Sequence, residues 1–370
     1  MKNGTSLYLD LVRFSAALAV FLEHTREHTL PNFGGFWEAH PFWNFHLGSY
    51  SQIAVIVFFV LSGYVIAHVL ATRETTPLEY AASRFGRLYS VVLPALLLVA
   101  ATNYLVELRF PNAFPEFASL GAARIALHYL GTALFMGHFW LWPDLEPPTA
   151  DPMWSLTFEA SYYLAIALFV FASGRVRILS LVLLSVLAGP TAVLLAPTWL
   201  LGYGAYHVRR SRQMDAGFAT MLWLGFTILL LLCPLVRENI RYPLPFLRMP
   251  DKHLGELLAS YAAAIFFAAS LLAFDALSDS AELHLRPFTA VIRWLGSMTF
   301  ALYLFHQPLL TFLSVYRIVK PSVAPALWVI WVVGGTFLIV ITLGRLCERS
   351  KGAYKRLFLS MSLGVSGATR

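Results

Sequence analysis

Apolar runs long enough to cross a bilayer recur along the whole chain, and they constrain its fold more than any other feature. Only 13% of the residues are charged, compared with about 25% in soluble domains, and the mean hydropathy is +0.66. Because every backbone polar group must be satisfied inside a bilayer, the sequence predicts an all-α, polytopic transmembrane helical bundle. No long hydrophilic stretch interrupts it, so residues 1–370 are expected to form one integral-membrane domain. The eleven apolar segments are roughly 7–24, 51–71, 88–106, 120–140, 153–172, 177–194, 197–208, 216–236, 256–276, 289–313 and 325–347.

Basic connections between these segments predict the orientation of the chain. Lys and Arg gather in ATRETTPLEYAASRFGR, SGRVR, HVRRSRQ and the tail ERSKGAYKRLF, and short basic loops stay on the cytoplasmic side. Counting crossings from each end places WPDLEPPTADP on opposite sides, so one segment must fail to cross. The weakest is 120–140, which carries an arginine and two histidines; alternatively, 177–208 crosses only once. We expect about ten crossings, both termini in the cytoplasm and a short cytoplasmic tail from about residue 348.

Charge and cysteine content exclude several function classes. The net charge of +7 does not indicate a nucleic-acid partner, because the arginines cluster between apolar segments as the positive-inside rule requires. Cys233 and Cys347 lie in or at the end of apolar runs and predict neither a disulfide framework nor a metal site. The N-terminal MKNGTSLYLD lacks the basic region and cleavage site of a signal peptide, so the first helix is expected to stay in the protein.

The first apolar segment, DLVRFSAALAVFLEHT, carries charges that a bilayer disfavours. At about 100° per residue, Arg13 and His24 lie about 20° apart on the helical wheel, and Asp10 lies within roughly 60° of both. Glu23 points to another face. At a rise of about 1.5 Å per residue, Arg13 and His24 are roughly 16 Å apart along the axis. They are therefore expected to act at different depths, with Asp10 pairing with Arg13.

Further polar side chains enter other apolar segments, where each needs a partner or a function. Arg84 and Arg87 share a helix face, and they either grip phosphates by bidentate hydrogen bonds or meet lipid headgroups. Glu159 either pairs with an arginine of another helix or takes part in chemistry. His306 is either a structural residue or part of a site. Together these residues favour a lined polar cavity, for which the other candidates are Asp10, Ser62, Trp154, Ser155 and Tyr303.

Five motifs in order resemble those of the family-3 membrane acyltransferases. They are LDLVRFSAALAVFLEH, FFVLSGYVI, the arginine pair in RFGR, MWSLTFEASYYL and SMTFALYLFHQPLL. The resemblance extends from about residue 7 to about residue 312. Members of this family move an acyl group, usually acetyl from acetyl-CoA, to a hydroxyl of a sugar or another small acceptor.

The resemblance implies a role for several residues. His24 corresponds to the catalytic base, Arg13 to its motif partner, and Arg84 and Arg87 to residues that bind the coenzyme. Glu159 and His306 fall on further motif positions. The second Glu of one motif is replaced here by Ala160, so Glu159 would act alone. Longer relatives carry an additional hydrolase-like domain, so in this chain the donor and the acceptor are expected to meet in the membrane domain itself.

We therefore expect a membrane O-acyltransferase that uses acyl-CoA, needs no metal and acts on a glycan or glycolipid in the bacterial inner membrane. A histidine can take the acceptor hydroxyl proton at neutral pH, and a carboxylate from another helix, such as Glu159, is expected to orient His24. A covalent acyl-enzyme is an alternative to direct transfer. The rival functions are a sugar-lipid transporter or flippase, which inverted repeats would favour, and a glycan polymerase. Only the acyltransferase should release free CoA.

Overall fold

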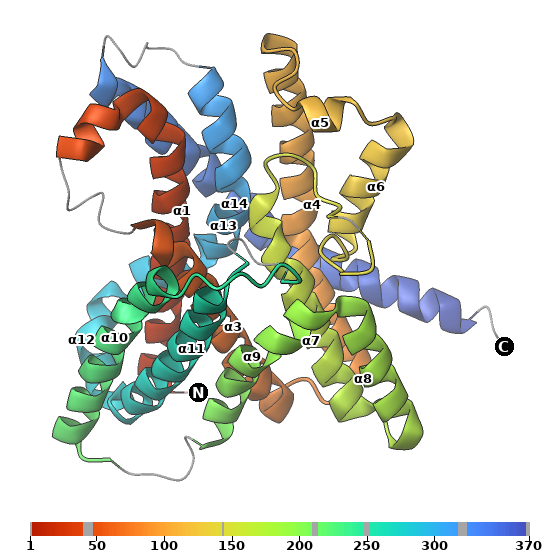
Figure 1. Ribbon diagram of the computed structural model, residues 1–370. Coiled ribbons are helices and arrows are strands. Elements are labelled where there is room, and N and C mark those ends of the chain that lie inside the picture. The colour runs from red at the N-terminus through yellow and green to blue at the C-terminus, as the bar shows by residue number, and fades with distance from the viewer. Residues whose placement is uncertain are drawn as a thin grey trace. The chain divides into compact units, whose positions relative to one another are not determined.

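The described residues of the computed structural model form helices joined by short connections, with no strand among them. The structure describes residues 2–39, 47–142, 144–208, 214–247, 252–316 and 324–367. Most of the predicted basic connection HVRRSRQ lies outside these ranges. The helices are α1 (Asn3–Ala39), α3 (Leu47–Thr72), α4 (Pro77–Arg109), α5 (Pro115–Ala118), α6 (Ala122–Ala133), α7 (Trp154–Phe171), α8 (Gly174–Ala188), α9 (Pro190–Val208), α10 (Ala216–Asn239), α11 (Leu254–Ala276), α12 (Ser278–Leu285), α13 (Thr289–Val315) and α14 (Pro325–Gly367), with 3-10 turns η1 (Asp151–Met153) and η3 (Arg286–Phe288) (Figure 1).

The helical, membrane-type fold predicted from the sequence is confirmed. Within the described part of the chain, eight helices are long and apolar enough to cross a bilayer, and the bent pair α8–α9 makes nine if it counts as one span. Ten crossings would require α8 and α9 to cross separately. With 15 residues, α8 reaches about 22 Å at 1.5 Å per residue, which is short of the roughly 30 Å hydrocarbon core. The count of eight or nine is therefore lower than the predicted ten.

The two doubtful segments of the sequence both depart from a straight span. Segment 120–140 holds only α6, a helix of 12 residues, which agrees with its choice as the weakest crossing. In segment 177–208, α8 and α9 meet at an angle of 116°. The break is at Gly189, whose φ of +89° disfavours other residues, followed by Pro190 as the first residue of α9. Pro197 lies inside α9 and does not end it.

Contacts between helices group the chain into two compact units, each built from separate segments. Unit 1 comprises Met1–Val20, His46–Arg73 and Val182–Thr299, and unit 2 comprises Phe21–Phe45, Glu74–Leu181 and Phe300–Arg370. Helices α1, α8 and α13 therefore contribute to both units.

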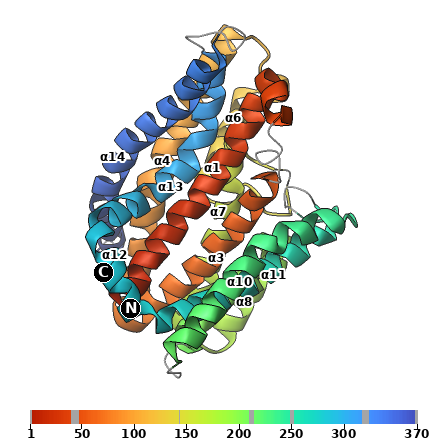
Figure 2. The same ribbon diagram turned by 90° about the vertical axis from the view of Figure 1, so that its left-hand side faces the viewer.

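In unit 1, small residues allow the backbones of α3 and α9 to approach closely. A Cβ built on Gly202 would lie 1.9 Å from the carbonyl oxygen of Val60, and one on Gly63 would lie 2.1 Å from that of Trp199. Helices α10 and α11 run side by side in the same unit (Figures 1 and 2).

In unit 2, α4 packs along α14 (Figure 2). The contact is close at Gly86, where a Cβ would lie 2.9 Å from the carbonyl oxygen of Lys351. Helix α4 also meets α7, through a hydrogen bond of 3.1 Å from the Tyr80 hydroxyl to the carbonyl oxygen of Tyr163. These contacts hold together α4 and α7, which carry five of the eleven predicted site residues.

Candidate functional site

The imidazole of His24 forms a dyad with a carboxylate of its own helix. His24 Nδ1 lies 2.9 Å from Glu27 Oε2, three residues further along α1. An ionised carboxylate only accepts hydrogen bonds, so it holds the proton on Nδ1 and leaves the lone pair on Nε2. The prediction that Glu159 orients His24 is therefore wrong, because Glu27 takes that position. The i, i+3 spacing of the two residues was the sequence signal for this pair.

The second histidine of the motifs, His306 of α13, lies beside the first. The ring centroids of His24 and His306 are 5.2 Å apart. His306 is fully buried, and its Nδ1 lies 2.9 Å from the carbonyl oxygen of Leu302, to which it donates. Its Nε2 is buried with no hydrogen-bond partner among the described residues. Two imidazoles with an available Nε2 lone pair are thus brought together from segments about 280 residues apart in the chain.

A pair of buried hydroxyls lies close to His306. Tyr303 Oη and Ser155 Oγ are 2.8 Å apart, on α13 and α7 respectively, and the Tyr303 ring centroid is 6.4 Å from that of His306. The structure thus brings the predicted cavity residues Ser155, Tyr303 and His306 together. Trp154 instead packs edge-on against Phe158 of its own helix.

Glu159 belongs to a different cluster, between α7 and α4. The hydroxyl of Tyr163 donates to Glu159, and the guanidinium of Arg84 lies over the Tyr163 ring at 5.7 Å. Arg84 Nη2 is 2.9 Å from Glu74 Oε1, and both side chains are nearly buried. The charge of Arg84 is therefore already compensated by Glu74, a pairing that the sequence analysis missed.

Arg87 lies one turn beyond Arg84 on α4 and is half-buried. Next to this turn of the helix, Lys355 of α14 donates from Nζ to Ser83 Oγ at 3.2 Å. The close contact at Gly86 brings the backbone of Lys351 to the same place. The side chain of Lys355, in the predicted tail, thus lies beside this part of α4, which was not foreseen from the sequence.

The remaining predicted residues lie in unit 1. Arg13 pairs with Asp10, with Nη1 and Oδ1 3.5 Å apart, as predicted. Arg293 of α13 also pairs with Asp10 through its Nη1, an interaction that the sequence analysis missed. Ser62 accepts a hydrogen bond of 3.2 Å from Trp199 Nε1, so it serves the packing of α3 on α9.

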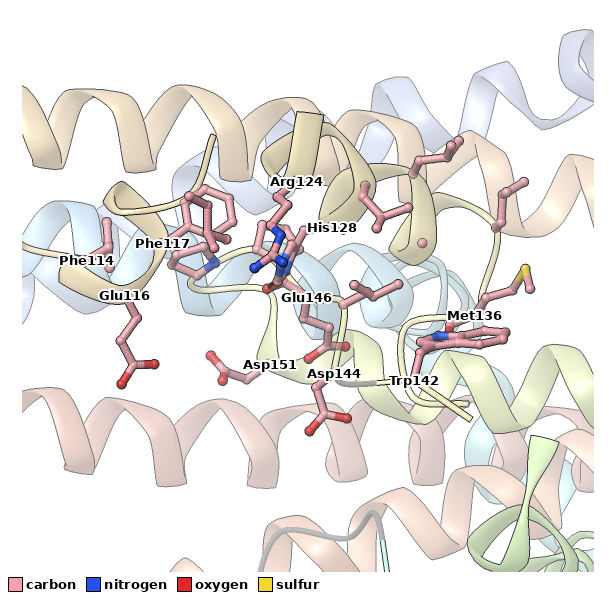
Figure 3. Close-up of a pocket in the computed structure, with 18 of the residues that line it drawn as sticks. Phe114, Glu116, Phe117, Arg124, His128, Met136, Trp142, Asp144, Glu146 and Asp151 are labelled. Atoms are coloured by element: carbon pink, nitrogen blue, oxygen red, sulfur yellow. Dashed lines mark hydrogen bonds between the residues drawn. The ribbon is translucent and has the colours of Figure 1, made fainter. Parts of the chain in front are cut away.

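The connection between α4 and α7 encloses a pocket that was not predicted (Figure 3). Its volume is about 1170 Å³. The lining includes the aromatic residues Phe114, Phe117 and Trp142. It also includes four acidic and two basic residues, which are Glu116, Asp144, Glu146, Asp151, Arg124 and His128.

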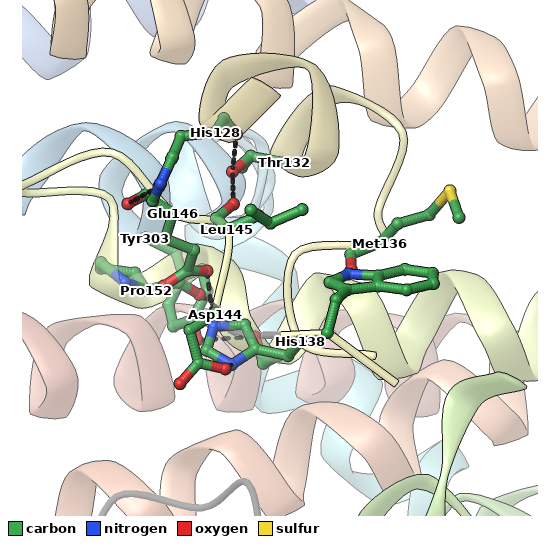
Figure 4. A network of polar contacts seen from close by, with 11 residues as sticks. His128, Thr132, Met136, His138, Asp144, Leu145, Glu146, Pro152 and Tyr303 are labelled. Atoms are coloured by element: carbon green, nitrogen blue, oxygen red, sulfur yellow. Dashed lines mark hydrogen bonds and ion pairs between the residues drawn. The ribbon is translucent and has the colours of Figure 1, made fainter. Parts of the chain in front are cut away.

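Ion pairs and hydrogen bonds hold the wall of this pocket in place (Figure 4). His138 lies between two carboxylates, with Nδ1 3.2 Å from Asp144 Oδ1 and Nε2 2.9 Å from Glu146 Oε1. Burial lowers the pKa of His138, but hydrogen bonds to Asp144 and Glu146 outweigh it and raise the pKa to about 9. Burial raises the pKa of Glu146 to about 7, and the nearby His138 limits the rise. Thr132 Oγ1 donates to the carbonyl oxygens of His128 and Leu145, which ties α6 to this loop.

A family model decides the class of this chain. The model of an acyltransferase domain, that of acyltransferase family 3, matches residues 6–345, which is nearly the whole chain. The chain belongs to acyltransferase family 3. No curated protein and no solved structure matches it.

For a family-3 acyltransferase, the groups near His24 are of the types that acyl transfer requires. An imidazole held by a carboxylate supplies a base, and paired hydroxyls supply donors for a developing oxyanion. The family match covers Arg84, Arg87 and every other predicted site residue. In the described part of this acyltransferase, no group of three or more His, Cys, Asp or Glu side chains is placed to hold a metal ion.

Proposed function

We propose that this membrane acyltransferase moves an acyl group, in the simplest case acetyl, from acyl-CoA to a hydroxyl of a glycan or glycolipid. The proposal places the protein in the bacterial inner membrane, with both termini in the cytoplasm. The observation that carries it is the His24–Glu27 dyad, with Nδ1 and Oε2 2.9 Å apart. A carboxylate that fixes the imidazole tautomer makes Nε2 a general base.

In the proposed reaction, His24 Nε2 takes the proton of the acceptor hydroxyl while its oxygen attacks the thioester carbonyl. The new C–O bond forms, the C–S bond breaks, and the CoA thiolate leaves with the proton returned by His24. General-base help of this kind is worth about 10²–10⁴-fold. Glu27 stabilises the imidazolium that forms during the transfer. Direct transfer is the simpler of the two routes, since it needs no covalent intermediate.

Tyr303 and Ser155 are proposed to stabilise the oxyanion of the thioester carbonyl. Their hydroxyls are 2.8 Å apart, and Ser155 Oγ also donates to the carbonyl oxygen of Pro152 at 3.3 Å. A substrate oxygen would have to take the place of Pro152 as acceptor of this longer hydrogen bond. The ring of Tyr303 is 6.4 Å from that of His306, which is itself beside His24. His306 is the second candidate base, because its buried Nε2 has no partner in the described structure.

The phosphates of the donor are proposed to bind at the α4 arginines. Arg87 is proposed as a phosphate contact because a guanidinium offers bidentate hydrogen bonds to a phosphate. Arg84, which pairs with Glu74, is proposed to position this turn of α4. Lys355 of α14, which donates a hydrogen bond to Ser83 of α4, supplies a further cation. Arg13 is paired with Asp10, so we propose that it stabilises its helix and affects donor binding only indirectly.

The test uses the purified protein in lipid nanodiscs with acetyl-CoA and envelope glycans of the source cells. Wild-type protein should release free CoA and add acetyl groups that mass spectrometry detects on the glycans. His24→Ala should lower the rate at least about 100-fold, the lower bound for a general base, while binding of radiolabelled acetyl-CoA persists. His24→Gln should not restore it, because an amide takes up no proton at neutral pH.

The matched control is His284→Ala, because His284 is an exposed histidine of α12, and it should leave the rate unchanged. Near-normal turnover by folded His24→Ala protein would refute the base assignment and leave His306 as the next candidate. Transport of a sugar lipid without CoA release would instead support the rival class.

A further inference from the structure

The pocket between α4 and α7 has the construction of a ligand site. Its volume of about 1170 Å³ exceeds the range of about 300–1,000 Å³ that is usual for small-molecule pockets. It therefore has room for more than one sugar unit. Its wall belongs to the stretch that contains WPDLEPPTADP.

Hydrogen bonds fix the polar and aromatic groups of the wall. Trp142 donates from Nε1 to the carbonyl oxygen of Met136 at 2.9 Å, which sets the plane of its ring. His128 Nδ1 lies 2.9 Å from the carbonyl oxygen of Glu146. On the α4 side, Asn103 donates to the carbonyl oxygen of Pro148 at 2.7 Å. A preformed wall of this kind loses little entropy when a ligand binds.

The wall combines apolar rings with hydrogen-bond acceptors. Phe117 and Trp142 offer flat apolar faces, and four carboxylates line the same pocket. In Figure 3, the carboxyl groups of Glu116 and Asp144 point downward, and Asp151 lies between them. Carboxylates accept hydrogen bonds from hydroxyls, and polar groups set among apolar side chains are typical of sites that orient a ligand.

One residue links this pocket to the dyad on α1. Asp151 lines the pocket and also lies close enough to His24 to interact with it electrostatically. A ligand in the pocket that reaches past Asp151 would therefore bring a hydroxyl toward His24. This arrangement is the one that an acceptor of the proposed reaction needs.

The charge of the pocket restricts that acceptor. The lining holds four carboxylates and the guanidinium of Arg124, and His138 pairs with two of these carboxylates. Because Glu146, with a pKa of about 7, is only partly ionised, negative charges exceed positive ones by one to two. At an effective dielectric constant of about 20, one like charge at about 10 Å lowers affinity about tenfold. Phosphate and uronate groups are therefore disfavoured here, while hydroxyl and ammonium groups are not.

We infer that this pocket is the acceptor site, and that it takes uncharged or amine-bearing sugar units and rejects anionic ones. The inference rests on the proposed acyl transfer and adds the place and the class of the acceptor.

The first arm of the test measures acceptor choice. Envelope glycans of the source cells are separated by anion exchange into an unretained and a retained, anionic fraction, and CoA release is measured with each. The unretained fraction should support transfer with at least about tenfold higher kcat/KM. Glu116→Lys, at an exposed position of the wall, should raise kcat/KM for the anionic fraction about tenfold or more. Glu282→Gln, outside the pocket, should change neither value.

The second arm measures occupancy without turnover. Leu127→Cys places a thiol in the pocket wall, in a background where the two native cysteines, both buried, are replaced by serine. A cationic methanethiosulfonate should modify it faster than an anionic one, and the unretained glycan fraction should protect it. If the wild-type protein uses the anionic fraction well and Glu116→Lys does not change its kcat/KM, the inference is wrong and the proposed function still stands. If neither fraction releases CoA, the proposed function fails. The labelling result is independent of CoA release. If the cationic and the anionic reagent modify the cysteine equally fast and the unretained glycans give no protection, the assignment of this pocket as the acceptor site is wrong.

Discussion

Replacing Glu27 by Gln tests whether this carboxylate activates His24. The glutamine keeps the size of the side chain and its ability to accept a hydrogen bond from Nδ1, but it removes the negative charge. The structure places Oε2 of Glu27 2.9 Å from Nδ1 of His24. The substitution therefore changes the electrostatics of the dyad and little else.

The expected magnitude follows from the exposure of this pair. A hydrogen bond to a charged group contributes about 1.5–3 kcal/mol, which corresponds to a factor of roughly 10–150 in rate. The side chain of Glu27 is 51% exposed, so water weakens its charge and the lower end applies. We expect kcat to fall about tenfold, while the KM for acetyl-CoA stays unchanged, because the charge acts on the imidazolium that forms only during transfer.

The assay is the initial rate of CoA release by purified protein in nanodiscs at several concentrations of acetyl-CoA. Glu159→Gln is the matched control, because Glu159 receives its hydrogen bond from Tyr163 and not from His24. It should alter the KM for acetyl-CoA more than kcat, since Tyr163 lies against Arg84. An unchanged kcat for Glu27→Gln would refute the dyad. A tenfold loss of kcat in Glu159→Gln with no loss in Glu27→Gln would restore the expectation drawn from the sequence.

Two further predictions concern the packing of the helices and the pH dependence of the pocket wall. Gly202→Ala should lower the free energy of unfolding in detergent by about 1–3 kcal/mol, because its Cβ would lie 1.9 Å from the carbonyl oxygen of Val60. Gly204→Ala is the control and should leave this free energy unchanged, because its Cβ would meet nothing within 4 Å. The pKa values of Glu146 and His138 are both raised, to about 7 and about 9, so their contribution to stability is present at low pH and is lost as the pH rises through these values. For His138 the loss is about 3 kcal/mol, so the thermal midpoint should decrease as the pH is raised from 6.5 to 9. In His138→Gln this decrease should be smaller. An equally large decrease in that variant would contradict the assignment.

Local patterns in the sequence were enough to predict the helices and the contacts within one helix. Hydrophobic segments of span length predicted the helical membrane fold, and the three-residue spacing of Asp10 and Arg13 predicted their ion pair. The dyad of His24 and Glu27 has the same spacing. This dyad was not predicted, because a carboxylate of another helix, Glu159, was expected to orient His24, although the spacing of His24 and Glu27 was visible in the sequence.

Contacts between distant segments could not be predicted in this way. Arg84 was assigned to the coenzyme from the family resemblance, and the structure pairs it with Glu74 across a helix boundary. The second partner of Asp10, Arg293, lies 283 residues away in the chain. Periodicity predicts which face of a helix is polar, but it does not indicate which helix lies opposite that face.

The sequence by itself determined that this protein is a helical membrane acyltransferase and which side chains cannot lie in lipid without a reason. Only the tertiary structure decided that His306 lies beside His24, that Ser155 meets Tyr303, and that the stretch after α4 folds into an acidic, aromatic pocket. The physical reason is that the cost of burying a polar group depends on the group alone, whereas its partner depends on how helices from distant parts of the chain pack together.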